Sequence, residues 1–305
     1  MIQAFRIIEQ AYKRSRQWAQ EIADGQELSP SRITSFKICG LLFYFKHHLK
    51  MKFPPAARMV FGTAGHAAVN TDLTVKAETG ETVKDTLLTE LFTDTLHENM
   101  REVDRKMERE PLNAIENEFR DKWTRLFPIY RGRVEPKLNP KFVEHRIEYP
   151  IEIVSTQGKP QLVKIVNHLD VITKNREIRD HKFRARANGN TDIPTLQMAS
   201  YALAYEYETG KPPKSVQHDT YVALKREAKM IPQRMDALDP QARVALTLDV
   251  QTILRASEAG VFPIPIRGQY PCTPSWCPAW KICPYGGGGR KANKFLPSGQ
   301  RIALP

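Results

Sequence analysis

Short strand-like segments in the second half of the chain restrict the fold more than any other feature of the sequence. Three segments rich in branched residues, "KFVEHRIEYPIEIV", "QLVKIVNHLDVIT" and "EIRDHKFRA", fall within residues 141–185 and are separated by turn-forming residues such as those at 157–160. Residues 194–210 begin with proline and end with glycine around a helical interior, and residues 215–225 return to a strand pattern. The order strand, strand, strand, helix, strand predicts an α/β fold in which helices flank a mixed central β-sheet.

Helical patterns are expected on both sides of these strands in the sequence. They comprise a basic amphipathic helix over 3–23, a helix that starts at Ser29-Pro30-Ser31, a small-residue helix carrying His66 after Pro54 and Pro55, charged helices over 81–128, and a helix from about 240 to 259. We interpret about 81–135 as a helical insertion into one domain that runs from residue 1 to 285. Residues 286–305 have the composition of a flexible basic tail.

The charge of the chain favours a polyanionic partner. Its 305 residues carry 46 Lys and Arg against 34 Asp and Glu, a net charge of +12, and 41% hydrophobic residues suffice for a core. Nucleic acid fits this excess better than a membrane surface does, although positive charge also serves simple solubility. No apolar run approaches the roughly 20 residues of a membrane span, and the opening segment lacks the apolar centre of a signal peptide. We therefore expect an intracellular, cytoplasmic protein without membrane contact.

An acid and a base lie two positions apart in the third strand-like segment. Side chains of a strand alternate between faces, so Asp180 and Lys182 project from one face and His181 from the other. Alone, the pair is equally consistent with an exposed ion pair, which contributes little. Asp170, near the end of the preceding strand, changes this interpretation. Two converging carboxylates bind a hard cation such as Mg²⁺ and leave coordination positions for a phosphodiester and a water molecule. Lys182 would then orient or help to deprotonate that water and offset developing charge.

Three further side chains are candidates for the same site. Gln197 and Tyr201 are four residues apart in the predicted helix, so they share one helix face and can contact phosphate or support Lys182. His66 can supply a nitrogen ligand, which would shift the preference of the site toward Mn²⁺. Taken singly, each of these three residues is more often structural than functional.

The four cysteines of the chain are unevenly distributed. Cys272, Cys277 and Cys283 lie within twelve residues, whereas Cys39 lies far upstream. Disulfides are disfavoured in a reducing compartment, and four thiols match the four corners of a tetrahedral metal site. Zinc and an iron–sulfur cluster satisfy this pattern equally well. Either would join the two ends of the chain, and the alternative is ordinary buried cysteine.

In their order along the chain, these motifs resemble the PD-(D/E)XK nuclease superfamily, and specifically its RecB-like branch. The resemblance rests on Asp170, on "DHK" at 180–182, on "QMASY" at 197–201 and on "GTAGH" at 62–66, and it spans residues 29 to about 285. The chain departs from the pattern at three places: Asn167 replaces a common glycine, His181 an apolar residue, and "CTPSWC" a shorter cysteine spacing.

The resemblance implies a restriction-endonuclease-like core and a DNA nuclease, commonly an exonuclease, that hydrolyses phosphodiester bonds with Mg²⁺ or Mn²⁺. It also implies that His66, Asp170 and Asp180 hold the metal. Lys182 would be the catalytic lysine. The residues that would support it are Gln197 and Tyr201.

The same resemblance tips the choice for the cysteines toward iron and sulfur. AddB nucleases and CRISPR-adaptation nucleases of this branch carry a 4Fe–4S cluster on one early and three late cysteines. That implies a cluster region formed by residues 29–50 and 268–285, with zinc as the alternative metal. The cluster ligands would be Cys39, Cys272, Cys277 and Cys283.

The implied partner is DNA, either single-stranded or with free ends, in repair or recombination, together with recombination or replication proteins. A different class of function stays open: a non-catalytic DNA-binding or assembly subunit with the same fold. The intact Asp170, Asp180 and Lys182 favour the enzyme. A basic scaffold stabilised by zinc, with no role on nucleic acid, is the third hypothesis.

Overall fold

The computed structural model describes residues 27–105, 108–184, 195–224, 227–237 and 239–287. The predicted helix over 3–23, the turn at 188–190 and the basic tail beyond 287 lie outside these residues. The described chain divides into two compact units. Unit 1 comprises residues 1–53, 148–166 and 243–305, and unit 2 comprises residues 54–147 and 167–242, as far as they are described.

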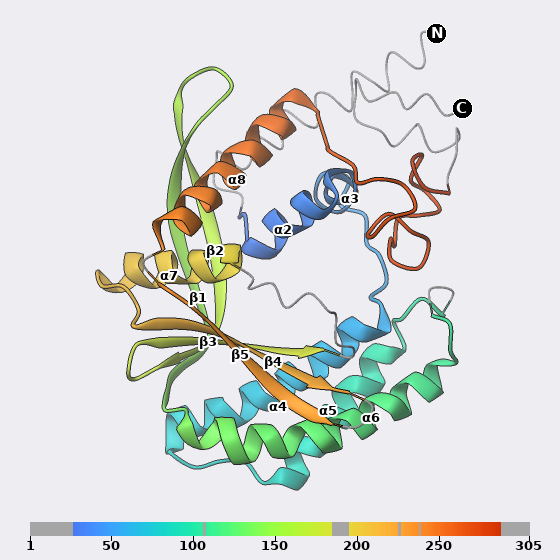
Figure 1. Ribbon diagram of the computed structural model, residues 1–305, viewed down its shortest axis with the longest axis vertical. Coiled ribbons are helices and arrows are strands. Elements are labelled where there is room, and N and C mark those ends of the chain that lie inside the picture. The colour runs from blue at the N-terminus through green and yellow to red at the C-terminus, as the bar shows by residue number, and fades with distance from the viewer. Residues whose placement is uncertain (1–26, 106–107, 185–194, 225–226, 238, 288–305) are drawn as a thin grey trace. The chain divides into compact units, whose positions relative to one another are not determined.

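A five-stranded sheet with the order β1-β2-β3-β4-β5 is the central element of the fold (Figure 1). β3 pairs antiparallel with β2 but parallel with β4, and β5 returns antiparallel to β4. The sheet is therefore mixed and flanked by helices, which confirms the predicted fold class. Its strands are β1 (Pro140–Val154), β2 (Pro160–Thr173), β3 (Glu177–Arg184), β4 (Ser215–Ala223) and β5 (Ala228–Met235).

The fifth strand is an element that the sequence pattern did not predict. β5 has the sequence AKMIPQRM, in which Ile231 is the one β-branched residue and Pro232 lies in the interior. Proline cannot donate to a β-ladder, so it argues against a central strand. β5 lies at the end of the sheet order, where only one neighbour is needed, and proline is tolerated there.

Helices of unit 2 cover one face of the strands β3 to β5. α4 (Ala57–Thr79), α5 (Asp85–Met100) and α6 (Leu112–Ile129) pack on one another, and α4 contacts β3 while α6 contacts β4 and β5 (Figure 1). The predicted charged helices over 81–128 are thus confirmed as α5 and α6. Phe92 of α5 stacks on Trp123 of α6 with ring centroids 4.3 Å apart, at the centre of this core.

A buried carboxylate in the second half of α4, the helix that carries His66, fixes that helix to its neighbours. Asp72 is fully buried and accepts hydrogen bonds from the Tyr130 hydroxyl at 2.7 Å, from Arg131 Nη1 at 3.0 Å and from the Val83 backbone at 2.8 Å. A buried charge is tolerated only when it is paired and hydrogen-bonded, as here. The three donors tie α4 to the start of α5 and to the π-helix η3 (Tyr130–Val134) that follows α6.

Unit 1 contains the helix that was predicted from its Ser-Pro-Ser start. Ser29 caps α2 (Pro30–Ile38) by accepting a hydrogen bond from the Arg32 backbone, and a short α3 (Gly40–Phe43) and the π-helix η1 (Tyr44–His48) follow. Gly40 approaches Pro263 so closely that a Cβ atom would lie 2.5 Å from the proline Cδ. α8 (Pro240–Ala259), predicted with the same bounds, begins in unit 2 and continues in unit 1.

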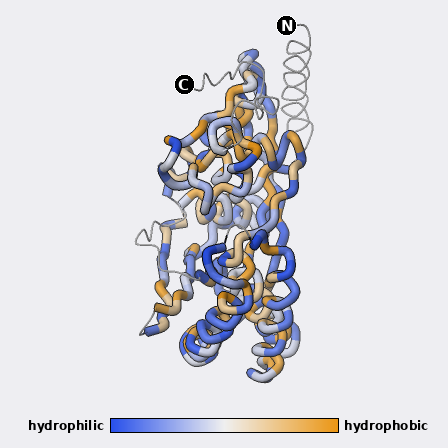
Figure 2. Tube along the Cα trace, turned by 90° about the vertical axis from the view of Figure 1, so that its right-hand side faces the viewer, coloured by the Kyte–Doolittle hydropathy of each residue, from blue (hydrophilic) through white to orange (hydrophobic). Residues whose placement is uncertain are grey.

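Hydrophilic and hydrophobic residues alternate along the helices in Figure 2, as amphipathic surface helices require. Among the described residues, no helix is both long and apolar enough to cross a membrane.

We expect Gly65→Ala to destabilise the fold, because a Cβ atom at residue 65 would lie 2.4 Å from Cγ of Phe183. Phe183 has little freedom to move away, since it stacks on Tyr221 with centroids 4.6 Å apart and also contacts Trp123. Overpacking of this kind lowers the free energy of unfolding by about 1–3 kcal/mol. Urea denaturation followed by circular dichroism measures the change.

Gly62→Ala in the same helix is the matched control. Its Cβ atom would meet only the Phe183 carbonyl oxygen at 3.5 Å, an ordinary contact. Alanine also favours a helix over glycine by about 0.5–1 kcal/mol, so this variant should be neutral or stabilised. Equal destabilisation of both variants would contradict the packing argument.

Candidate active site

Asp180 lies at the centre of the candidate site and is buried with its charge fully compensated. Its Oδ1 atom accepts hydrogen bonds from Lys182 Nζ at 2.7 Å and from Gln197 Nε2 at 3.2 Å, and the Tyr201 hydroxyl donates to it at 3.4 Å. Its Oδ2 atom contacts His218 Nδ1 at 2.7 Å. A carboxylate offers about four lone-pair sites, so Oδ2 retains room for one further ligand.

The protein donors around Asp180 come from three elements of unit 2. Lys182 is on the same face of β3, as the alternation of strand side chains predicted. Gln197 and Tyr201 are on α7 (Thr195–Thr209), four residues apart, and Gln197 Nε2 also donates to the Tyr201 hydroxyl oxygen at 2.6 Å. His218 is the partner of Asp180 in the parallel register of β3 with β4. Sheet register and helix spacing together therefore assemble this site.

A second group of side chains, the metal group, consists of His66, Glu144 and Asp170 and can hold a metal ion. Ligand atoms of His66, Glu144 and Asp170 all lie within 4.8 Å of one another, and His66 Nδ1 is 3.6 Å from Asp170 Oδ2. Asp170 is buried and also accepts a hydrogen bond from the His181 backbone at 2.8 Å. One imidazole nitrogen with two carboxylates suits Mn²⁺ or Mg²⁺.

Glu144 owes its position to an unusual backbone conformation. Its φ of 52° lies in the left-handed region, which is uncommon for residues other than glycine, although it lies within strand β1. A residue of this kind interrupts the alternation of a strand and can turn a side chain toward a site. The Glu144 carboxylate also accepts a hydrogen bond from Asn70 on α4.

Protonation states in this region follow from burial and neighbouring charge. Burial and the charge of Asp180 raise the pKa of Asp170 well above its usual value. Burial would do the same to Asp180, but Lys182 and His218 outweigh it and lower the Asp180 pKa to about 2. Burial opposes the charge on Lys182, yet Asp180 and Asp170 raise its pKa. Burial, helped by Lys182, lowers the pKa of His66 to about 4, so its ring is neutral at pH 7 and able to bind a metal.

Two residues of this site, Glu144 and His218, were missed by the sequence argument. His218 lies in the predicted strand over 215–225, and the register that sets it beside Asp180 was the missing information. The sequence pattern of β1 does not indicate the left-handed backbone at Glu144, and only this interruption of the strand brings Glu144 to the metal group. Of the residues predicted for this site, His66 and Asp170 lie in the group with Glu144, and Asp180 is not part of that group. Asp180 instead gathers Lys182, Gln197 and Tyr201 around its carboxylate, within the same unit 2.

Departures from the expected motif pattern have structural explanations. Asn167, in place of a common glycine, accepts a hydrogen bond from the Ser200 hydroxyl at 2.7 Å and thereby links β2 to α7. His181, in place of an apolar residue, is fully buried, and its Nδ1 lies 3.3 Å from the Tyr221 hydroxyl. Burial, reinforced by the nearby charge of Arg179, lowers the His181 pKa to about 3, so the neutral ring occupies the apolar position.

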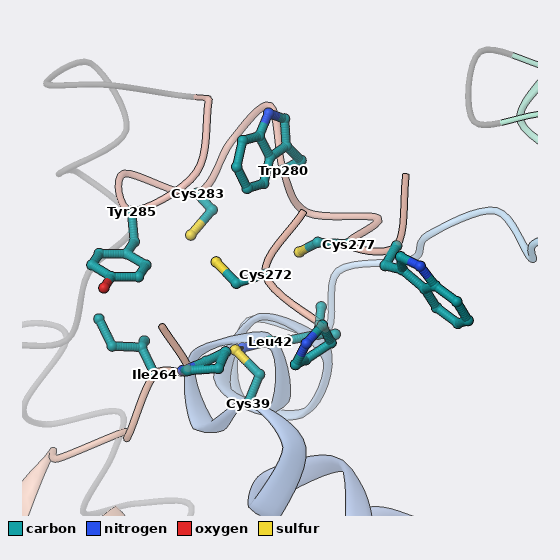
Figure 3. Close-up of a pocket in the computed structure, with 11 residues that line it drawn as sticks. Cys39, Leu42, Ile264, Cys272, Cys277, Trp280, Cys283 and Tyr285 are labelled. Atoms are coloured by element: carbon teal, nitrogen blue, oxygen red, sulfur yellow. Dashed lines mark hydrogen bonds between the residues drawn. The ribbon is translucent and has the colours of Figure 1, made fainter. Parts of the chain in front are cut away.

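The four cysteines, all within the described part of the chain, line one pocket of unit 1 (Figure 3). None of them forms a disulfide. Burial and the other cysteines raise the pKa of Cys277 to about 12, and burial raises that of Cys39 to about 11. Leu42 and Trp280 also line the pocket. A metal or cluster fits this donor set, because it would stabilise thiolates that are unfavourable otherwise.

The sequence matches the family model of the PD-(D/E)XK nuclease superfamily over residues 27–284, and the chain belongs to this superfamily. Its fold is similar to the crystal structure of a candidate exonuclease from Eubacterium rectale, with a TM-score of 0.50 and 13% identity over 81% of this chain and 86% of that one. A weaker similarity, with a TM-score of 0.32 and 13% identity, covers 83% of this chain and 96% of SSO0001. No curated protein matches the sequence.

We expect His181 to make stability depend on pH. Its pKa is about 3 in the folded chain against 6.5 ordinarily, so the unfolded state binds the proton first as the pH falls. The free energy of unfolding should therefore decrease on acidification from pH 6.5 toward 3, by up to about 1.4 kcal/mol per pH unit from this one residue. Urea denaturation of the wild type and of His181→Leu at a series of pH values measures this slope.

The variant should lose less stability per pH unit than the wild type inside this window. Above about pH 7 an ordinary histidine is already neutral, so the two profiles should run parallel there and serve as the internal control. Identical slopes throughout would contradict a buried neutral His181.

Proposed function

We propose that this protein is a metal-dependent DNA nuclease of the RecB-like branch, acting as an exonuclease on phosphodiester bonds, with residues 1–285 as its nuclease domain. The observation that carries the proposal is the convergence of His66, Glu144 and Asp170 beside the compensated Asp180–Lys182 pair. Membership of the superfamily supports it as well. That the enzyme removes nucleotides from DNA ends, rather than cutting internally, is also proposed. The similar structure from Eubacterium rectale is described as a candidate exonuclease, but its similarity to this chain is one of fold.

His66, Glu144 and Asp170 would hold one Mg²⁺ or Mn²⁺ ion, and we propose that Asp180 joins them through Oδ2, the oxygen that also contacts His218. When bound, the ion supplies Lewis acidity to a phosphate oxygen and to a water molecule. Burial and the charge of Asp180 raise the pKa of Asp170, and the positive charge of the ion would oppose both effects. Metal binding should therefore release a proton from the site.

Lys182 acts as a cation in this proposal. Its pKa is raised by two carboxylates, so Nζ stays protonated and can donate a hydrogen bond to a phosphate oxygen or to a water molecule that attacks phosphorus. Gln197 and Tyr201 hold the Asp180 oxygen that accepts from Lys182, so they position the pair.

DNA is the proposed substrate, bound mainly through phosphates. The net charge of +12 supplies affinity without sequence preference, and that affinity should weaken as salt rises. An intracellular location fits four free thiols that are grouped as metal ligands, since disulfides are disfavoured in reducing compartments.

Cys39, Cys272, Cys277 and Cys283 are the proposed ligands of a 4Fe–4S cluster, with zinc as the alternative. The cluster would be structural, because it would link α2 and α3 to the loop at 264–285 within unit 1. We propose that the cluster takes no direct part in cutting DNA. The residues proposed to act on the phosphate, Asp180 and Lys182 with the metal group, belong to unit 2.

Cleavage of end-labelled DNA tests the catalytic proposal. With Mg²⁺ or Mn²⁺, the wild type should shorten the DNA, and Asp180→Asn and Lys182→Met should each lower kcat by about 10²–10³-fold, because each removes a charge that acts on the reacting phosphate. Glu144→Gln should raise the metal concentration needed for half-maximal activity. Gel electrophoresis of samples taken over time measures these rates and the polarity.

Lys174→Met is the matched control, since Lys174 is an exposed lysine in the turn between β2 and β3 and should be dispensable. If the wild type binds DNA but does not cut it with either metal, a non-catalytic DNA-binding or assembly subunit replaces the nuclease.

A separate experiment tests the cluster. Protein purified without oxygen should be brown and contain about four iron and four sulfide per chain, and Cys272→Ser should lose most of both, since one of four ligands is gone. Iron, sulfide and zinc analysis with visible absorption measures this.

Thr273→Ala, next to Cys272 in the same loop, is the control and should retain the cluster. Colourless wild-type protein with about one zinc per chain would replace the cluster with a tetrahedral zinc site.

A further inference from the structure

We propose that Phe142 and His145 form a stacking surface for an unpaired nucleobase beside the metal group, so that the site takes single-stranded DNA. The inference rests on the proposed nuclease function and narrows its substrate. Both rings lie in the first part of β1, residues 140–147, which belongs to unit 2 together with the candidate site.

The two rings form an exposed aromatic pair on an outer strand of the sheet. Phe142 is 41% exposed, and its ring stacks on that of His145 with centroids 4.6 Å apart and planes 16° from parallel. β1 is at one end of the sheet order, so this edge is not covered by a further strand of the described sheet. Exposed aromatic rings of this kind are the surfaces on which single-stranded nucleic acid stacks its bases.

The left-handed residue between the rings explains why they meet. Phe142 and His145 are three positions apart, and in a regular strand they would point to opposite faces. Glu144, with a φ of 52°, lies between them and interrupts this alternation. The same residue contributes its carboxylate to the metal group with His66 and Asp170. One backbone feature therefore sets the stacking surface next to the metal ligands.

Contacts with α7 orient the pair relative to the rest of the site. His145 Nε2 lies 3.0 Å from a carboxylate oxygen of Glu208, near the end of the helix that carries Tyr201.

A positive group lies close enough to accompany a strand across this surface. Lys141 Nζ lies 4.9 Å from the centroid of the Phe142 ring. A lysine over an exposed ring gains little and is easily replaced by a base, which stacks more strongly. Lys141 would then be released to bind a backbone phosphate.

Single exposed phenylalanines are common and need no function, so exposure alone does not carry the inference. Three features combine here: a stacked pair of rings, a left-handed residue between them in sequence, and the place of that residue's carboxylate in the candidate metal group. Bases in duplex DNA are already stacked and paired, so this surface favours an unpaired strand.

Fluorescence quenching of 2-aminopurine in a single-stranded oligonucleotide tests the inference. The full-length protein is used, with Ca²⁺ in place of Mg²⁺ to limit cutting. Wild-type protein should quench the fluorophore, and Phe142→Ala and Phe142→Leu should raise the Kd for the single strand about 10-fold while the Kd for a blunt duplex changes less than about twofold. Phe142→Trp should retain both quenching and affinity, because tryptophan also stacks. In cleavage assays, Phe142→Ala should raise KM for single strands and leave kcat unchanged.

Leu87→Ala, which removes an exposed apolar side chain from α5, is the matched control and should behave as the wild type. If the wild type binds and cuts DNA but Phe142→Ala leaves quenching and the single-strand Kd unchanged, the stacking surface is wrong and the nuclease stands. If quenching depends on Phe142 but no DNA is cut, the nuclease is wrong and the surface stands. A wild type that binds no DNA overturns both.

Discussion

The buried negative charge of Asp180 is the constraint on which unit 2 depends. A carboxylate removed from water costs several kcal/mol unless it is paired and hydrogen-bonded. Here the compensation comes from Lys182 on the same strand, from His218 on the next strand and from two residues of α7. Any shift of α7, or of β4 against β3, would remove a donor and leave the charge unpaired. The sheet register that compensates the charge of Asp180 is therefore the same register that assembles the candidate site.

A second requirement concerns how closely α4 approaches the sheet. Gly65 allows the helix to lie directly on Phe183, and His66 follows it in sequence, so the helix delivers an imidazole to Asp170 at 3.6 Å. Two turns further along, Asp72 ties the same helix to Arg131 and Tyr130. The helix is therefore held at two points, near its middle by packing against a ring and two turns further on by a charge network. A metal ligand gains affinity from this kind of preorganisation.

The periodicity of single strands and helices was enough to predict which side chains within one element share a face. The alternation of β3 placed Asp180 and Lys182 on one face, and the helical spacing placed Gln197 with Tyr201. The predicted bounds of α8 and of most strands also agree with the structure. Pairing between segments far apart in sequence has no such local signal, which is why His218 was missed, at 38 residues from Asp180. β5 was missed because its proline is unfavourable in a strand until the edge position is known.

Glu144 illustrates a different limit, because its position opposes local preference. A non-glycine residue in the left-handed region costs about 1–2 kcal/mol, and a strand pattern gives no reason to expect it there. Such a conformation persists only where surrounding contacts hold it, and here Val143 packs on the core while Asn70 holds the Glu144 carboxylate. A regular strand would put Phe142 and Glu144 on one face and His145 on the other. The interruption instead lets Glu144 join the metal group while the two rings stack at the edge. The same local strain would therefore serve both metal binding and the orientation of the strand to be cut.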